Sequence, residues 1–234
     1  MAPTREQVAQ AIYGAEVSAA RERVSASALA ADQLARVLLA AESETDRSAA
    51  ILLFALAEDL MLGGLKANLN PDVWGDGKSV AGPNGPLGTA SNRLMMLQLL
   101  YWIRDSTAQD LRRLKAIRNH FAHHPDVAAF SDPKIASWID ALQPWEKPLI
   151  THPDFSHFDP GPLSSRQKYL IRAGCAVAQL ASDLAVGPAA RIHRVDPGDV
   201  EGGFDDLLPN TRQVRLLMAD VMLRVLGAAA APTS

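Results

Sequence analysis

The sequence predicts an all-α protein, a helical bundle of about seven or eight helices. Alanine and leucine dominate a composition with 48% apolar and only 6% aromatic residues, which favours helix over sheet. Apolar residues recur with helical spacing along most of the chain, and no alternating, β-branched stretch reaches the length of a strand. A chain of 234 residues can bury a sizeable core, so we expect one domain with extensions.

The N-terminal part should be a helical extension followed by a buried central helix. Residues 1–44 form the extension, in which the apolar spacing between Thr4 and Ala41 predicts one or two amphipathic helices. The next segment is almost wholly apolar from Ala49 to Leu62 and stops at Asn70-Pro71. This segment therefore predicts the central helix of the core.

An acidic pair interrupts this central helix. Glu58 and Asp59 are adjacent, so their side chains point about 100° apart and at least one should face the interior, where it needs a partner. Arg118 offers one, because it falls on the apolar face of a later helix, the face marked by Leu111, Leu114, Ile117 and Phe121. We expect a structural ion pair between Arg118 and Glu58 or Asp59, on grounds of charge balance.

A turn-rich loop separates the central helix from the next helices. Residues 75–88 contain five glycines and two prolines. Its GDGKS sequence is no phosphate-binding loop, because Asp72 stands where the first glycine of that motif belongs and no strand precedes it. Ser91 or Thr89 should cap a short apolar helix that runs to residue 103. A capping box at residues 107–110 then predicts a helix that Pro125 ends.

The C-terminal half predicts two further core helices. Ser131 or Asp132 should cap the first, with Pro133 in its first turn. Five prolines make residues 143–163 an irregular excursion, and residues 164–186 predict a long helix. The core therefore spans residues 45–186. Residues 187–234 predict a Gly/Pro-rich segment, an amphipathic helix over 211–226 and a disordered tail.

Several motifs resemble known helical families. Arg118, Asn119 and His123 form an Arg-x4-His motif that resembles the signature of HEPN domains. The order of features over roughly residues 45–185 resembles the mannitol operon repressor (MltR-like) family. That resemblance rests on FALAEDLMLGGLK, GPLGTASNRLMMLQLLYWI, DLRRLKAIRNHFAHH, FSDPKIASWIDAL and SSRQKYLIRAGCAVAQLA, of which GPLGTASNR and IRNHFAHH are the most specific.

The resemblance implies a non-catalytic bacterial regulator without its own helix-turn-helix. Such a protein would be a homodimer and would act through a protein partner that binds DNA. The alternative is a HEPN-type, metal-independent ribonuclease, in which the resemblance makes Arg118, Asn119 and His123 catalytic. In that case His123 would assist attack by the ribose 2′-hydroxyl and Arg118 would steady the phosphate, roles that suit imidazole and guanidinium groups.

These residues also have structural interpretations. Asn119 and His123 could cap the helix C-terminus, where the helix dipole favours a histidine. The basic stretch of Arg112, Arg113 and Lys115 could contact a phosphate or form a solvated helix face.

Composition limits the remaining classes of function. A net charge of −3 provides no overall field to attract a nucleic acid. The spacing of His120, His123, His124 and Asp126 matches no standard zinc site, so we expect neither a metal nor another cofactor. The lone Cys175 cannot form an intrachain disulfide, which suits the cytoplasm. The longest apolar run has nine residues and the first residues are polar, so we expect no membrane span or signal peptide.

Overall fold

The computed structural model describes residues 33, 36–147, 161–192 and 225. Throughout these residues the secondary structure is helical and contains no strand, which confirms the all-α fold. The helices are α2 (Asp46–Asn68), α3 (Pro71–Trp74), α4 (Lys78–Ala81), α5 (Ala90–Leu99), α6 (Asp105–His123), α7 (Pro133–Ala141) and α9 (Ser165–Ile192). Residues 36–43 are also helical. Most of the expected N-terminal extension, and the C-terminal helix and tail apart from Val225, lie outside the described residues.

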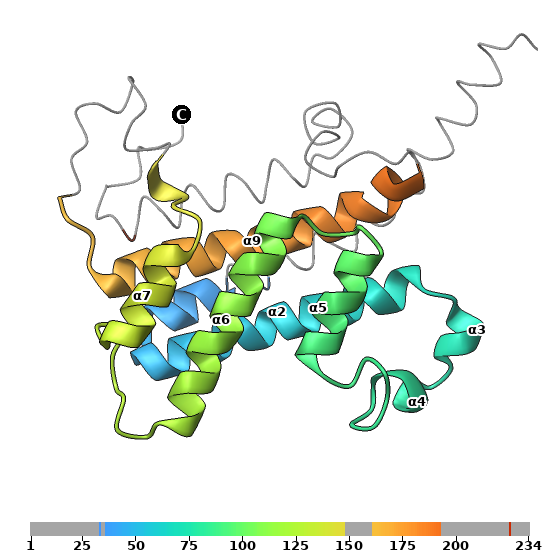
Figure 1. Cartoon of the computed structure of the whole chain (residues 1–234), viewed down its shortest axis with the longest axis horizontal. Helices are drawn as coiled ribbons and strands as arrows, with labels where there is room; N and C mark the ends of the chain where they lie inside the picture. Colours follow the sequence, from blue (N-terminus) through green and yellow to red (C-terminus); the bar gives the residue numbers. More distant parts are fainter. Residues whose placement is uncertain (1–32, 34–35, 148–160, 193–224, 226–234) are drawn as a thin grey trace, which may run out of the picture.

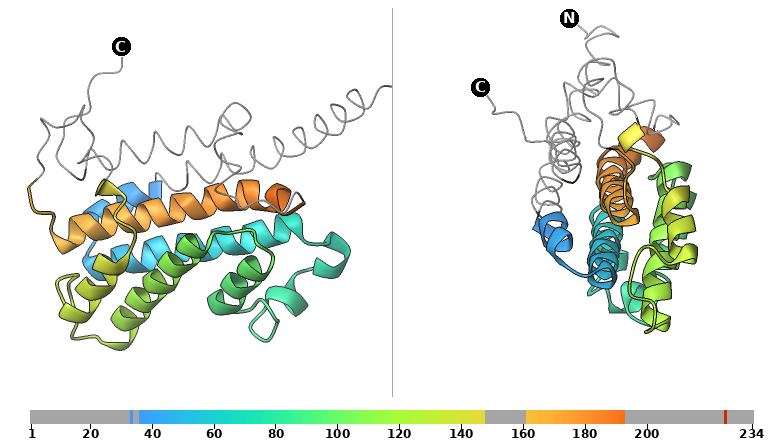
Figure 2. Two further views of the ribbon diagram at one scale, coloured as in Figure 1. Left: turned by 45° about the horizontal axis from the view of Figure 1, so that its top comes forward. Right: turned by 90° about the vertical axis from the view of Figure 1, so that its left-hand side faces the viewer.

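The bundle has two layers. The long helices α2 and α9 lie side by side, and α5, α6 and α7 form a second layer across them (Figures 1 and 2). Residues 36–43 lie on the side of α2 away from this second layer (Figure 2). Helices α2 and α9 run parallel, since Arg166 pairs with Asp46 near their first turns and Leu184 lies against Gly64 further along.

The core forms where these layers meet. Helix α2 approaches α9 closely at Gly64, where a Cβ would lie 2.8 Å from the Leu184 side chain, and Ala49, Ala50 and Ala57 of α2 are fully buried. Aromatic rings fill the end of the core near the start of α9: Phe130 stacks on Tyr169 at 4.1 Å and meets Phe121 edge-on at 5.6 Å between ring centroids. Helix α2 is long and apolar enough to cross a membrane by length and composition, and 44% of its most apolar window is buried within the bundle.

Polar side chains set most of the helix starts. Thr89, rather than Ser91, caps α5 by accepting a hydrogen bond from the Asn92 backbone N–H. Asp132 caps α7 in the same way, with Pro133 in the first turn as expected. These caps fix where α5 and α7 begin beside α6.

Three predicted boundaries are wrong. Helix α5 ends at Leu99, rather than at residue 103. Helix α6 begins at Asp105 rather than at the box of residues 107–110, because Thr107 and Asp110 are buried and hydrogen-bond to residues distant in sequence. Helix α9 continues to Ile192, beyond the predicted core boundary at residue 186. A side chain at Gly187 would collide with the backbone of Trp102, so the glycine allows close packing here instead of ending the helix.

Candidate interaction groove between helices α5 and α6

Helix α6 carries the residues of the Arg-x4-His motif, but it does not bring Arg118 and His123 together. The Arg118 guanidinium donates a hydrogen bond from Nη1 to Asn119 Oδ1 at 3.0 Å. His123 is the last residue of α6 and is exposed. Within the described part of the chain, no hydrogen bond or ion pair connects His123 with either residue. A five-residue separation on a regular helix turns two side chains about 140° apart, so they do not converge within one chain.

The predicted ion pair between Arg118 and the acidic residues of α2 is wrong. Asp59 is exposed, Glu58 is half-buried, and neither forms an ion pair with Arg118. Charge balance alone did not identify the partner: the Arg118 guanidinium bonds instead to the neighbouring Asn119 side chain.

The C-terminal end of α6 is capped from another helix. Nη2 of Arg47 donates to the carbonyl oxygens of His124, Pro125 and Val127 at 3.0, 3.0 and 2.8 Å. These carbonyls lie at and just beyond the helix end, where cations are favoured. The sequence assigned this role to Asn119 or His123, and nothing local could indicate that a residue 77 positions away performs it.

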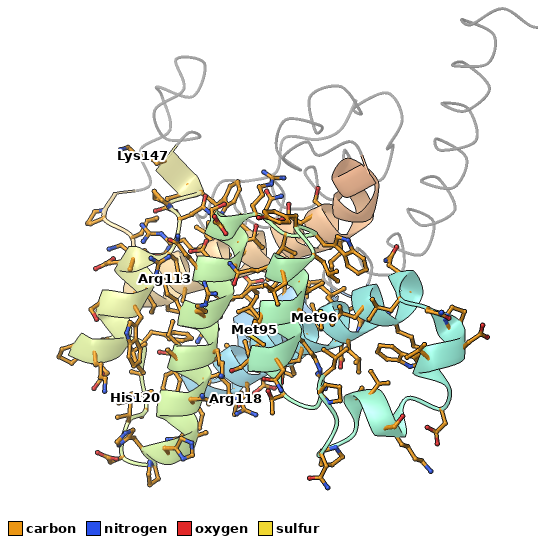
Figure 3. The ribbon with its side chains drawn as sticks, turned by 45° about the vertical axis from the view of Figure 1, so that its right-hand side comes forward. Met95, Met96, Arg113, Arg118, His120 and Lys147 are labelled. Carbon is orange, nitrogen blue, oxygen red and sulfur yellow. The ribbon has the colours of Figure 1, made fainter. Side chains whose placement is uncertain are left out.

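His120 lies on the flank of α6 that faces α7, opposite Arg118 (Figure 3). Its side chain is only 10% exposed, its ring meets Trp138 edge-on at 5.6 Å, and Nε2 lies 3.9 Å from Asp132 Oδ1. Burial lowers the pKa of His120, and the nearby charges of His124 and Lys134 lower it further, against the opposing effect of Asp132 and Asp126. Over the described ranges, no group of three His, Cys, Asp or Glu side chains is arranged to hold a metal.

A shallow groove of about 370 Å³ runs between α5 and α6. Ser91, Leu94 and Met95 line it from α5, and Arg112, Lys115, Ala116 and Asn119 line it from α6. Hydrogen bonds join its two walls, from Arg112 to the side-chain oxygen of Gln98 and from Lys115 to the hydroxyl of Ser91. These bonds hold the cations along the edge of the groove.

The cations of the groove lack acidic partners. Arg112 and Lys115, which line the groove, hydrogen-bond only to neutral side chains, and so does Arg118 outside it; none of the three forms an ion pair with a carboxylate of the described residues. Arg113 differs from Arg112 and Lys115, because it pairs with the buried Asp110 at 3.0 Å; the phosphate contact expected of these three residues stays a prediction. Figure 3 shows Arg113 and Arg118 on separate parts of α6.

The α5 wall of the groove is apolar and accessible. Met95 is 55% exposed and Leu99, one helical turn further on, is 64% exposed. Leu97, on the core side of α5, is fully buried, and Leu94, which lines the groove, is only 5% exposed. Sequence reasoning missed this surface, because a run of apolar residues does not reveal which of them the neighbouring helices leave uncovered.

The fold and this site define a class: an all-α bundle with a groove that combines accessible aliphatic side chains and unneutralised cations. No family model matches the sequence, and comparison with curated proteins and with solved structures likewise finds no match.

Proposed function

We propose that this chain is a non-catalytic regulatory protein of the cytoplasm that acts as a homodimer by binding a protein partner. This is the function that the resemblance to the mannitol operon repressor family implies, and the partner would be the component that binds DNA. The observation that carries the proposal is the groove between α5 and α6, where the exposed Met95 lies beside cations without acidic partners and the exposed Leu99 follows one helical turn beyond. Exposed apolar patches of this kind are typical of protein interaction sites.

The arrangement of the motif residues favours binding over catalysis. General base catalysis on RNA requires an imidazole and a phosphate-binding cation that converge on one reacting group. In this chain Arg118 bonds to Asn119, and His123 lies at the exposed end of the helix, where no hydrogen bond joins it to either residue. Among the helices that the structure describes, none with base-reading side chains follows a tight turn, which disfavours direct operator binding by this part of the chain.

The proposal is tested by deleting the encoding gene in its host and measuring transcripts. We expect a small set of transcripts to change, and both the intact chain and its His123→Ala variant to restore them equally. A Leu53→Asp variant, which should unfold the core, serves as the negative control because Leu53 is fully buried in α2. Unchanged transcripts after deletion would overturn the regulatory proposal.

A metal-independent ribonuclease is the second candidate. The observation that favours it is that His123 is accessible and that Asn119, from the same motif, lines the groove. A partner subunit could then complete the site by bringing a second copy of the motif alongside. The test is cleavage of labelled RNA by the purified chain in EDTA, with His123→Ala and His124→Ala compared. Cleavage that is lost only with His123→Ala would establish this activity and replace the regulatory proposal.

A further inference from the structure

We infer that the groove between α5 and α6 binds an acidic, amphipathic helix of a partner protein. This inference rests on the proposed regulatory function and specifies the chemistry of its partner. The partner helix would place aliphatic side chains against Met95 and Leu99 and carboxylates against Arg112 and Lys115. This mode of recognition, an amphipathic helix in a groove, is common among peptide-binding proteins.

The apolar part of the groove has the spacing that a helix requires. Ser91, Met95 and Leu99 follow one another at four-residue intervals, so they form a single stripe along α5. Helix α5 has ten residues and is therefore about 15 Å long, which matches roughly three turns of a partner helix. A partner with apolar residues at positions i, i+3, i+4 and i+7 would cover the stripe.

The charged part of the groove selects an acidic partner. Arg112 and Lys115 lie three residues apart on α6 and line the groove, and Arg112 is exposed. Their present hydrogen bonds are to a glutamine and a serine, both neutral groups that a carboxylate can displace. Charge-assisted hydrogen bonds to carboxylates are roughly twice as strong as those between neutral groups.

The same features disfavour a nucleic acid as the ligand. Proteins that bind single strands present aromatic side chains on which the bases stack, and no aromatic residue lines this groove. Its apolar wall consists of Leu94 and Met95, with Leu99 one turn beyond, and aliphatic groups gain nothing from contact with phosphates. The chain as a whole carries a net charge of −3, which repels a long polyanion.

The inference is tested by fluorescence anisotropy with the full chain and two labelled peptides. The probe is the twelve-residue peptide EELAELLAELEE, and the control peptide KKLAKLLAKLKK has lysine in place of each glutamate. We expect the acidic peptide to bind at least tenfold more tightly than the basic one. Two groove variants, Arg112→Glu and Met95→Gln, should each weaken binding of the acidic peptide at least tenfold. Lys66→Glu, an exposed cation outside the groove, should leave it unchanged.

Each contrary result has a defined meaning. Absence of binding at 1 mM peptide, equal binding of both peptides, or equal loss with Lys66→Glu would overturn the inference. Displacement of the acidic peptide by a single-stranded RNA of 20 nucleotides would show that the groove is a nucleic-acid site. Circular dichroism of each variant verifies that the bundle is folded, and the conservative Arg112→Gln replaces Arg112→Glu if the latter unfolds. Transcript changes after gene deletion without peptide binding would leave the regulatory function standing and overturn only the groove inference.

Discussion

Replacing Asp183 by alanine is expected to destabilise the bundle by about 3–5 kcal/mol. Asp183 of α9 is 1% exposed, and its carboxylate accepts hydrogen bonds from residues at the start of α6. Its Oδ2 accepts hydrogen bonds from the Arg104 backbone N–H at 3.0 Å and from the Thr107 hydroxyl at 2.7 Å. Its Oδ1 accepts one from Gln179 at 3.0 Å and lies 2.9 Å from Nε of Arg104. This carboxylate therefore joins α9 to the N-terminal end of α6.

The magnitude follows from what the alanine would leave behind. The hydroxyl of Thr107 and the Arg104 N–H would lose their acceptor, and each buried, unsatisfied donor costs about 1–3 kcal/mol. Part of this cost is offset, because burial raises the pKa of Asp183 and so penalises the charged carboxylate in the native protein. Asp183→Asn has nearly the same shape and retains an acceptor oxygen, so it should cost less than Asp183→Ala.

The assay is urea denaturation at pH 7 followed by circular dichroism, supported by thermal unfolding. A loss of 3–5 kcal/mol corresponds to a fall in Tm of roughly 6–20 °C for a chain of this size. A double-mutant cycle with Thr107→Val isolates the shared hydrogen bond: the valine should cost about 1–2 kcal/mol alone and almost nothing beside Asp183→Ala. The reasoning is refuted if Asp183→Ala costs under ~1 kcal/mol, or if Thr107→Val costs the same in both backgrounds.

Three further predictions concern other parts of the bundle, each measured by the same denaturation assay. Gly63→Ala should stabilise α2 by about 0.5–1 kcal/mol, because a Cβ at this position meets no atom within 4 Å. Gly64→Ala should stabilise the protein less, or destabilise it, because its Cβ would lie 2.8 Å from the Leu184 side chain. Equal gains from the two substitutions would contradict this packing. Arg47→Ala should cost about 1–2 kcal/mol by uncapping α6, with Arg47→Lys recovering part of the loss, and a neutral effect of Arg47→Ala would disprove the cap. Because burial lowers the pKa of His120 in the folded protein, the unfolded chain takes up this proton first as the pH falls. The contribution of His120 to the free energy of unfolding is therefore fully present above about pH 6.5 and is lost as the pH falls from there to the lowered pKa. His120→Gln should flatten this decline, and an unchanged dependence of stability on pH would show that other groups cause it.

Local sequence patterns predicted the helices well and the contacts between them poorly. The apolar stripe of Leu111, Leu114, Ile117 and Phe121 was predicted from spacing alone, and all four side chains are fully buried. The cap and first turn of α7 were likewise predictable from Asp132 and Pro133, because both effects act within one turn of helix. The start of α6 was not, because its Thr107 and Asp110 are used in long-range contacts that override a local capping pattern.

The sequence by itself determined that this protein is a helical bundle, because helical periodicity and capping depend on residues within a few positions of one another. It also singled out α6 as the helix that carries the polar motif. Only the tertiary structure decided that Arg47 caps α6, that Arg118 and the acidic pair of α2 form no ion pair, and that Met95 and Leu99 remain uncovered. Those outcomes depend on the register and rotation of one helix against another, and both are set by the packing of the whole core.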